Sequence, residues 1–432
     1  MRFLASEAAA GIGARLVGPD VEISGASFDT RSIEPGQLFV PIVAERNGHE
    51  FIGAAYEAGA SCHLTSEVDP FRRAHTALEV ADTAEALLRL AAWARQRSSA
   101  QVVGVTGSVG KTSTKDLIRA ACAAGRRTTA NERSFNNEQG MPVTILNAPD
   151  DTEVLVLEMG MRGFGQITQL CEIARPSVGV VTAVGYSHTE LVGGIDGVAR
   201  AKRELVEALP ASGTAVLNAD DQRVVAMAPY TGANVLTYGE AGDVRIERLE
   251  LDDLARPRFD LSTPWGSVSV RLSVSGAHMA SNAAAAMAVA GSVGVDVEAA
   301  AAALAAATIS GMRMERIELA SGAVVINDAY NANPTSMGAA LDALAAMSAR
   351  RRVAVLGLMG ELDEVEGGHA QVADHARSQG VELIAVGTDL YGIEPVGDPV
   401  AALGDLADGD VVLVKASRAA GLESVVRALT GA

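Results

Sequence analysis

The sequence has few of the features that mark secreted, membrane-spanning or nucleic-acid-binding proteins. Its three cysteines, Cys62, Cys122 and Cys171, lie far apart without metal-ligand spacing, so we expect buried thiols in a reducing compartment. A formal net charge of −18 offers no basic surface to a phosphate backbone, which argues against nucleic acid as a partner. No basic segment followed by an apolar run opens the chain, and the most apolar stretch, residues 282–309, is broken by polar residues and glycine. We therefore expect two helices there instead of a membrane span, in a cytoplasmic protein.

What the sequence does contain indicates an α/β protein of three domains. Its 432 residues exceed one ordinary core, and 48% of them are hydrophobic while 20% are charged. The first block, residues 1–97, mixes short strands with helix-like stretches at 52–60 and 83–95, which predicts a small N-terminal α/β domain. Two further blocks follow, residues 98–310 and 311–432.

The second block has the pattern of a mostly parallel sheet. Short, continuous β-branched runs at 102–105, 154–157 and 178–184 are typical of buried strands, and a helix is predicted from 111 to 124. Strands that alternate with helices indicate parallel pairing. Period-two alternation between residues 244 and 274 predicts an antiparallel hairpin added to that sheet.

The third block repeats strand and helix. Apolar runs at 323–326, 353–358, 383–386 and 411–414 predict four strands, and a helix is expected at 336–348. This alternation predicts a smaller, doubly wound domain of Rossmann type.

A glycine-rich turn joins the first strand of the second block to its helix. Backbone N–H groups of such a turn face phosphates, and the helix N-terminus adds partial positive charge. Lys111 would neutralise the β and γ phosphate oxygens, and the Thr112 hydroxyl would reach Mg²⁺. The alternative is a chance glycine turn, and Val105 stands where the first glycine of a phosphate loop is usual. The candidate nucleotide-binding residues are Thr106, Gly107, Ser108, Gly110, Lys111 and Thr112.

Three further side chains follow strands or lie in a helix of the same block. Glu158 ends an apolar strand, where a magnesium ligand is expected beside a phosphate loop. His188 lies in a polar loop and Lys202 in a helix-like segment. Taken singly, a solvated histidine and a surface lysine are the ordinary interpretations.

The phosphate loop, Glu158-Met159-Gly160, the run at 183–191 and Ala201-Lys202-Arg203-Glu204-Leu205 occur in an order that resembles the Mur ligase family of ATP-dependent amide ligases. The resemblance implies a central domain of P-loop type, ATP as cosubstrate and two Mg²⁺ ions. It also implies that Thr112, Glu158, His188 and a carbamylated Lys202 hold the metal, since a carbamate supplies the anionic oxygens that a bare ammonium lacks.

The same resemblance extends to the nucleotide and to the third block. Asn282, in Gly276-Ala277-His278-Met279-Ala280-Ser281-Asn282, would bond adenine, and Arg313 would reach the γ-phosphate. Asp328 would accept a ribose hydroxyl, and Asn331 would contact the nucleotide. The implied catalytic residues are Lys111, His188, Lys202 and Arg313.

Two stretches, 134–142 and 327–334, resemble the family members that add D-alanyl-D-alanine to UDP-N-acetylmuramoyl-tripeptide. The resemblance implies these two small molecules as substrates of a monomer. Implied substrate-binding residues are Thr30, Arg31, Asn47, Gly48 and His49 near the UDP-sugar, Asn136 and Asn137, and Lys415, Ser417 and Arg418 near the incoming amine.

The implied reaction is phosphorylation of a carboxylate by ATP to an acyl phosphate, followed by attack of an amine. Three alternatives stay open. One is another ligase of the same fold, of the diaminopimelate-adding, lysine-adding or folylpolyglutamate type. Another is a P-loop kinase or NTPase, and the third is a catalytically silent relative, because Val109 and Ala416 depart from the family motifs.

Overall fold

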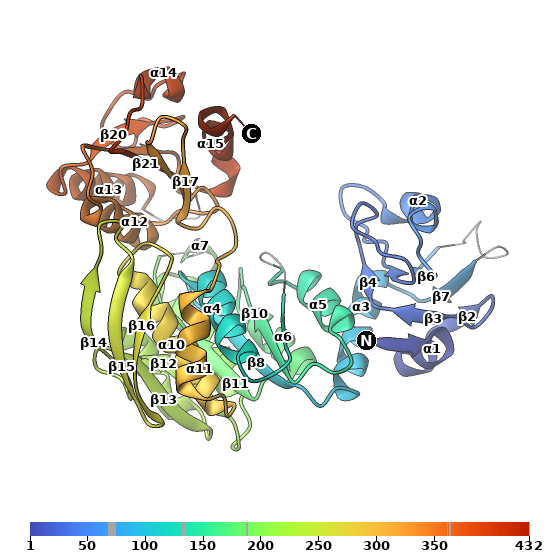
Figure 1. Ribbon diagram of the computed structural model, residues 1–432. Coiled ribbons are helices and arrows are strands. Elements are labelled where there is room, and N and C mark those ends of the chain that lie inside the picture. The colour runs from blue at the N-terminus through green and yellow to red at the C-terminus, as the bar shows by residue number, and fades with distance from the viewer. Residues whose placement is uncertain (68–74, 132–134, 187–188, 361, 363, 432) are drawn as a thin grey trace. The chain divides into compact units, whose positions relative to one another are not determined.

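The computed structural model describes residues 1–67, 75–131, 135–186, 189–360, 362 and 364–431 (Figure 1). The chain forms two compact units that alternate along the sequence. The first comprises Met1–Gly104, Arg126–Gly160 and Gln166–Val178, and the second comprises Val105–Gly125, Met161–Gly165 and Gly179–Ala432. The three predicted blocks, with boundaries after residues 97 and 310, stay a prediction.

The first unit contains a five-stranded sheet in the order β2-β7-β6-β5-β4. Its pairs are parallel except for β2 and β7, which run antiparallel. The strands are β2 (Arg15–Val17), β4 (Ala26–Ser27), β5 (Leu38–Phe39), β6 (Cys62–Thr65) and β7 (Thr76–Glu79), and β1 (Arg2–Leu4) pairs separately with β3 (Glu22–Ser24). The helices are α1 (Ala5–Ile12), η1 (Gly48–Phe51), α2 (Ile52–Glu57) and α3 (Thr83–Gln96), so both predicted helices are confirmed.

Helix α3 supplies much of the core of this unit. Asp82 accepts a hydrogen bond from Glu85 N at 2.8 Å and caps the helix start. Ala86, Leu87 and Leu90 are fully buried at helical spacing and pack with apolar strand residues.

Helix α5 (Gly140–Asn147) belongs to the predicted second block but packs in the first unit. The Asn147 side chain pairs with both backbone groups of Ala26, accepting from its N–H at 2.8 Å and donating to its carbonyl at 3.0 Å. This unit also contains the parallel pair β9 (Thr128–Ala130) and β10 (Val154–Glu158), and α6 (Gln166–Ala174).

Strand β8 (Gln101–Thr106) begins in the first unit and ends in the second. In the second unit the strands follow the order β16-β15-β14-β13-β12-β11. They are β11 (Val178–Val181), β12 (Thr214–Asn218), β13 (Asn234–Gly239), β14 (Val244–Leu251), β15 (Pro257–Thr263) and β16 (Gly266–Arg271). β12, β13 and β14 pair in parallel, whereas β14, β15 and β16 pair antiparallel. The predicted hairpin is therefore confirmed as β15–β16, and a third antiparallel strand extends it.

The helices of this part are α4 (Lys111–Ala123), α7 (Thr189–Val192), α8 (Ile195–Glu207), α9 (Gln222–Val225), η2 (Ala228–Tyr230), α10 (His278–Ser292) and α11 (Val297–Ala305). The predicted pair of alanine-rich helices is confirmed as α10 and α11. Helix α10 packs closely because its side chains are small: a Cβ at Gly291 would lie 2.3 Å from the Trp265 ring. Within the described part of the chain, no helix has both the length and the apolar character needed to cross a membrane.

A five-stranded sheet in the order β17-β18-β21-β19-β20 follows in the same unit. Only β17 (Glu315–Glu318) runs antiparallel, and the remaining pairs confirm the expected doubly wound arrangement. The other strands are β18 (Val324–Asn327), β19 (Arg351–Leu356), β20 (Glu382–Ala385) and β21 (Asp410–Lys415). The helices are α12 (Pro334–Ala346), α13 (Val365–Ser378), α14 (Pro399–Leu403), η3 (Arg418–Ala420) and α15 (Glu423–Thr430). The α/β fold class is confirmed.

Candidate functional site

The predicted phosphate loop links β8 to α4, and its backbone requires glycine at two positions. Gly107 has φ of +155° and Gly110 has φ of +79°, conformations that L side chains rarely adopt. A Cβ at Gly107 would lie 1.8 Å from the Thr182 Oγ1 atom, so the loop also approaches its neighbour too closely for a side chain.

Hydrogen bonds hold the loop against the chain that follows β11. Thr182 Oγ1 donates to the Val109 carbonyl at 2.6 Å, and Ser108 N donates to the Ala183 carbonyl at 2.8 Å. Ser108 Oγ donates to the Gly185 carbonyl at 3.0 Å and accepts from Gly185 N at 2.9 Å. The Ser108 hydroxyl therefore fixes the loop against Gly185.

Lys111 and Thr112 open helix α4, as the sequence predicts. Lys111 Nζ donates to the Gly107 carbonyl at 2.7 Å, so its ammonium group lies over the glycine turn. Thr112 is buried in the first helical turn, whose N–H groups carry partial positive charge. The arrangement suits a polyphosphate.

Lys202 lies on α8 and is only 3% exposed. Burial, and secondly the charge of Lys111, hold the pKa of the Lys202 ammonium well below its ordinary value. Among the residues that the structure describes, none forms a hydrogen bond or ion pair with this side chain. The structure therefore brings Lys111 and Lys202 within electrostatic reach, whereas His188 lies outside the described residues.

Glu158, in the first unit, is buried at the end of β10. Its carboxylate accepts from Asn136 Nδ2 at 2.8 Å, and its backbone N–H donates to Asn131 Oδ1 at 2.9 Å. The predicted metal ligand thus meets the predicted substrate loop. Asn137 Oδ1 accepts from Gly140 N at 2.9 Å and from Gln139 N at 3.3 Å, so this side chain also holds the turn that precedes α5.

The described residues offer a magnesium ion few protein ligands. No group of three or more His, Cys, Asp or Glu side chains close enough to hold an ion occurs among the described residues. Protein-bound Mg²⁺ typically takes one or two carboxylates and completes its shell with water and substrate phosphates. Glu158, a single buried carboxylate, fits that kind of site better than a site built from protein ligands alone.

Asn282, on α10, lies beside the phosphate loop. Its Oδ1 accepts from Thr114 Oγ1 at 3.2 Å, and a Cβ at Gly110 would lie 2.9 Å from the same oxygen. The structure thus joins Asn282 to the nucleotide loop, while its predicted contact with adenine stays a prediction.

Four predicted residues of the third block converge at the ends of β18 and β21. Lys415 Nζ donates to Asp328 Oδ2 at 2.6 Å and to the Asn331 carbonyl at 2.9 Å, in a largely buried ion pair. Asp328 Oδ1 accepts from Met314 N at 3.1 Å. The guanidinium carbon of Arg313 lies 4.0 Å from the centre of the Tyr330 ring. Tyr330 was not predicted, although the sequence places it within the recognised motif.

Ser417 and Arg418 follow β21. Ser417 Oγ accepts from Gly360 N at 2.7 Å, and Arg418 forms an ion pair with Glu423 at 3.4 Å. His369, which no sequence motif pointed out, is buried close to Gly360 in the chain. Its Nε2 accepts a hydrogen bond from Met359 N at 2.9 Å, and its Nδ1 donates to the Val365 carbonyl at 2.6 Å.

The candidates of residues 1–97 form local structures. Asn47 Oδ1 accepts from His49 N at 3.1 Å and from His49 Nδ1 at 2.9 Å, while His49 Nε2 accepts from Ser66 N at 3.1 Å. A Cβ at Gly48 would lie 2.5 Å from Ile42 N, so this corner is tightly packed.

The neighbouring Thr30 lies in a turn next to the most accessible cation of the predicted set. The Arg31 side chain is 87% exposed and pairs with Asp29 at 2.6 Å, and this hydrogen bond lowers the pKa of the Asp29 carboxyl. Arg31 is placed where a dissolved anion would reach it.

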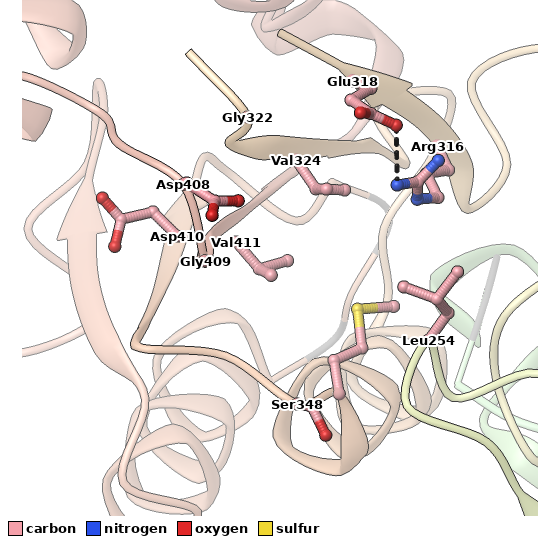
Figure 2. Close-up of a pocket in the computed structure, with 11 residues that line it drawn as sticks. Leu254, Arg316, Glu318, Gly322, Val324, Ser348, Asp408, Gly409, Asp410 and Val411 are labelled. Carbon is pink, nitrogen blue, oxygen red and sulfur yellow. Dashed lines mark hydrogen bonds and ion pairs between the residues drawn. The ribbon is translucent and has the colours of Figure 1, made fainter.

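A pocket of about 230 Å³ lies in the second unit, between the ends of β17, β18 and β21 and the segment that contains Leu254 (Figure 2). An ion pair of Arg316 and Glu318, 3.1 Å apart, lines one side, and Leu254 and Asp408 contribute to the wall. Figure 2 shows the Asp410 carboxylate directed away from the cavity, and it accepts instead from Arg350 at 2.7 Å. None of the predicted site residues lines this pocket.

Comparisons with known proteins point to one family. Residues 105–290 match the model of the Mur ligase middle domain, and residues 312–420 match the Mur ligase glutamate ligase domain. The chain is similar to the UDP-N-acetylmuramoyl-tripeptide–D-alanyl-D-alanine ligase of Mycobacterium tuberculosis, at 39% identity over 93% of this chain and 91% of that protein. The enzyme of that name from Escherichia coli is 34% identical over 96% of this chain and 95% of that protein.

Solved structures agree with these relatives. A crystal structure of MurF from Acinetobacter baumannii superimposes with a TM-score of 0.86 at 27% identity, covering 100% of this chain and 99% of the other. The structure of the MurF ligase from Thermotoga maritima in complex with ADP gives a TM-score of 0.82 at 27% identity. The match covers 94% of this chain and 97% of the other.

Proposed function

Because the chain belongs to the Mur ligase family, we propose that it is an ATP-dependent amide ligase that joins D-alanyl-D-alanine to UDP-N-acetylmuramoyl-tripeptide for peptidoglycan synthesis. The observation that carries this proposal is the glycine turn with Lys111 over it and Lys202 buried within electrostatic reach. It is supported by relatives that bear the name of this reaction over more than nine-tenths of the chain, and by the ADP complex of one structural neighbour. We also infer that it works as a cytoplasmic monomer on these small molecules.

The reaction needs an activated carboxyl group, since a carboxylate would have to expel oxide. A carboxylate oxygen of the tripeptide attacks the γ-phosphorus, and ADP leaves. The amine of the dipeptide then attacks the acyl carbon, phosphate leaves and the nitrogen loses a proton. Lys111 and the N–H groups at the start of α4 neutralise the phosphate oxygens, and Arg313 adds charge at the γ-phosphate. Magnesium, when bound, supplies further positive charge there, with Thr112, Glu158, His188 and Lys202 as its proposed ligands.

We further infer that Lys202 is carbamylated. Burial lowers the pKa of Lys202 and so favours its neutral amine, whose nitrogen attacks CO₂ and releases a proton to leave an anionic carbamate. Lys202→Ala should lose most of the ligase activity, and added short carboxylic acids should restore part of it. In Lys202→Met the same acids should restore no more activity than in Lys202→Ala. Carbon-13 NMR with labelled bicarbonate should show a carbamate signal in the wild type alone. A fully active Lys202→Ala enzyme would rule out this role.

The remaining candidates divide between the two substrates. Thr30, Arg31 and the corner Asn47-Gly48-His49 are proposed to bind the UDP-sugar, with an exposed guanidinium suited to pyrophosphate. Asn136 and Asn137 are proposed to face the peptide. Lys415, Ser417 and Arg418 are proposed to line the path of the amine, while Asn282, Asp328 and Asn331 contact the nucleoside.

An amine-acceptor panel tests the function directly. The enzyme, ATP and UDP-N-acetylmuramoyl-tripeptide with diaminopimelate or lysine at its third position are incubated with D-alanyl-D-alanine, D-alanine, lysine, diaminopimelate or glutamate. We expect a ligated product by mass spectrometry and phosphate release with D-alanyl-D-alanine alone. Lys111→Ala should abolish both readouts. Use of another amine would favour a different ligase of this fold, and ATP hydrolysis without any carboxylate would favour an NTPase.

A further inference from the structure

Asp116 lies on α4, further along the helix that Lys111 opens, and its side chain is only 7% exposed. One carboxylate oxygen, Oδ2, accepts both hydrogen bonds that Ser310 can offer, from its N–H at 2.8 Å and from its hydroxyl at 2.7 Å. The other oxygen, Oδ1, lies 3.0 Å from Lys115 Nζ. A buried aspartate thus holds a serine that is far away in the sequence, at the start of the linker to β17.

That linker carries Arg313. Met312 and Met314, on either side of it, have φ of +59° and +53°, an uncommon backbone conformation for residues with long side chains. Their N–H groups donate to carboxylates as well, Met312 N to Glu315 at 2.9 Å and Met314 N to Asp328 at 3.1 Å. The path of the chain around Arg313 is therefore fixed by acidic side chains, and Asp116 is the one that comes from the phosphate-loop helix.

We propose that Asp116 is a positioning residue for Arg313, acting through Ser310 to hold the arginine-bearing linker on the helix that binds the phosphates. The inference rests on the proposed function, because it assumes that Arg313 acts on the γ-phosphate. The Asp116 carboxylate contacts Ser310 and Lys115, so its effect on catalysis passes through the linker.

A double-mutant cycle tests this relation. Asp116→Ala, Arg313→Ala and the double variant are compared in kcat, in KM for ATP and in thermal unfolding temperature. Loss of placement should lower kcat about tenfold to a hundredfold in Asp116→Ala, with KM for ATP within about twofold of the wild type. In the Arg313→Ala background the same substitution should lower kcat less than about twofold, since no arginine remains to be placed.

Ser310→Ala is the milder variant, because it removes the hydroxyl and keeps the N–H. It should lower kcat in the same direction as Asp116→Ala and by a smaller factor. Asp116→Asn retains an acceptor oxygen and should recover part of the lost kcat. The matched control is Asp20→Ala, since Asp20 also accepts from the N–H and hydroxyl of one serine, Ser6, at 2.9 Å and 2.7 Å. This control should leave kcat unchanged.

The outcomes separate the two ideas. If Asp116→Ala lowers kcat by the same factor with and without Arg313, or lowers only the unfolding temperature, the positioning role is wrong while the ligase function stands. If Arg313→Ala keeps the wild-type kcat, the role of the arginine and the inference both fail. Absence of ligation by the wild type would refute the proposed function and the inference that depends on it.

Discussion

Replacing Gly107 with alanine should damage the phosphate loop by an amount that the structure allows us to work out. The new Cβ would lie 1.8 Å from Thr182 Oγ1, far inside any real contact distance, and the backbone there has φ of +155°. Thr182 would have to rotate, because it is the flexible partner, and its 2.6 Å hydrogen bond to the Val109 carbonyl would be lost.

Two terms add in this variant. The glycine-only backbone conformation costs about 1–3 kcal/mol for alanine. The lost hydrogen bond and the carbonyl left without its donor cost about 1–2 kcal/mol more. The sum is on the order of 3 kcal/mol, which corresponds to about a 150-fold change in an equilibrium constant. It should be divided between a lower free energy of unfolding and weaker ATP binding, since the loop can relax only by leaving its phosphate-binding shape.

Urea unfolding measures the loss in free energy of unfolding, and calorimetric titration measures the loss in affinity for ATP. Thr182→Ala removes the atom that Gly107→Ala would strike, so the double variant should be less destabilised than the sum of the single variants by about 1 kcal/mol or more. Gly13→Ala is the control for backbone conformation alone, because Gly13 has φ of +69° and nothing lies within 4 Å of its added Cβ. Wild-type stability and ATP affinity in Gly107→Ala would refute this account of the loop.

Three further outcomes can be measured. Lys415→Met should lower the free energy of unfolding by about 3–5 kcal/mol, because it leaves the largely buried Asp328 carboxylate without its cation. The double variant with Asp328→Asn should recover part of this loss. Equal stability of Lys415→Met and the wild type would contradict the pairing. Burial lowers the pKa of His369, so the unfolded state binds the extra proton and stability should fall as the pH drops below about 6.5; His369→Gln should lack that part of the pH dependence in unfolding titrations. Burial raises the pKa of the Cys122 thiol to about 12, so a thiol reagent should react slowly with the native protein. In denaturant the same reagent should label all three cysteines, whereas fast labelling of the native protein would show that the core is open.

The fold could be predicted where strands are buried on both faces. β8, β10 and β21 are short runs of apolar residues, and each was located within one or two residues. No pattern in the sequence identifies β12, or β13, whose first residues are exposed and lack alternation. The apolar run predicts a strand as far as Val184, whereas β11 ends at Val181 and the chain then turns to hold the phosphate loop.

The candidate site could be predicted only in its residue types. Motifs located Lys111, Lys202 and Asp328, because each stands at a strand end, at a helix start or in a recognised run. They did not reveal that Asp116 holds Ser310, since two residues almost two hundred positions apart leave no periodic signal. The turn that Asn137 holds was within reach, because asparagine often accepts a hydrogen bond from the backbone two residues further on.

The side chain of Asn147 has a consequence for how this protein behaves at high concentration. β4 is the edge strand of its sheet, and unpaired backbone groups at an edge are a template for another chain. By engaging both backbone groups of Ala26, the amide occupies part of that edge as a neighbouring strand would. Loss of Asn147 should therefore appear first as aggregation in light scattering, before any change in turnover.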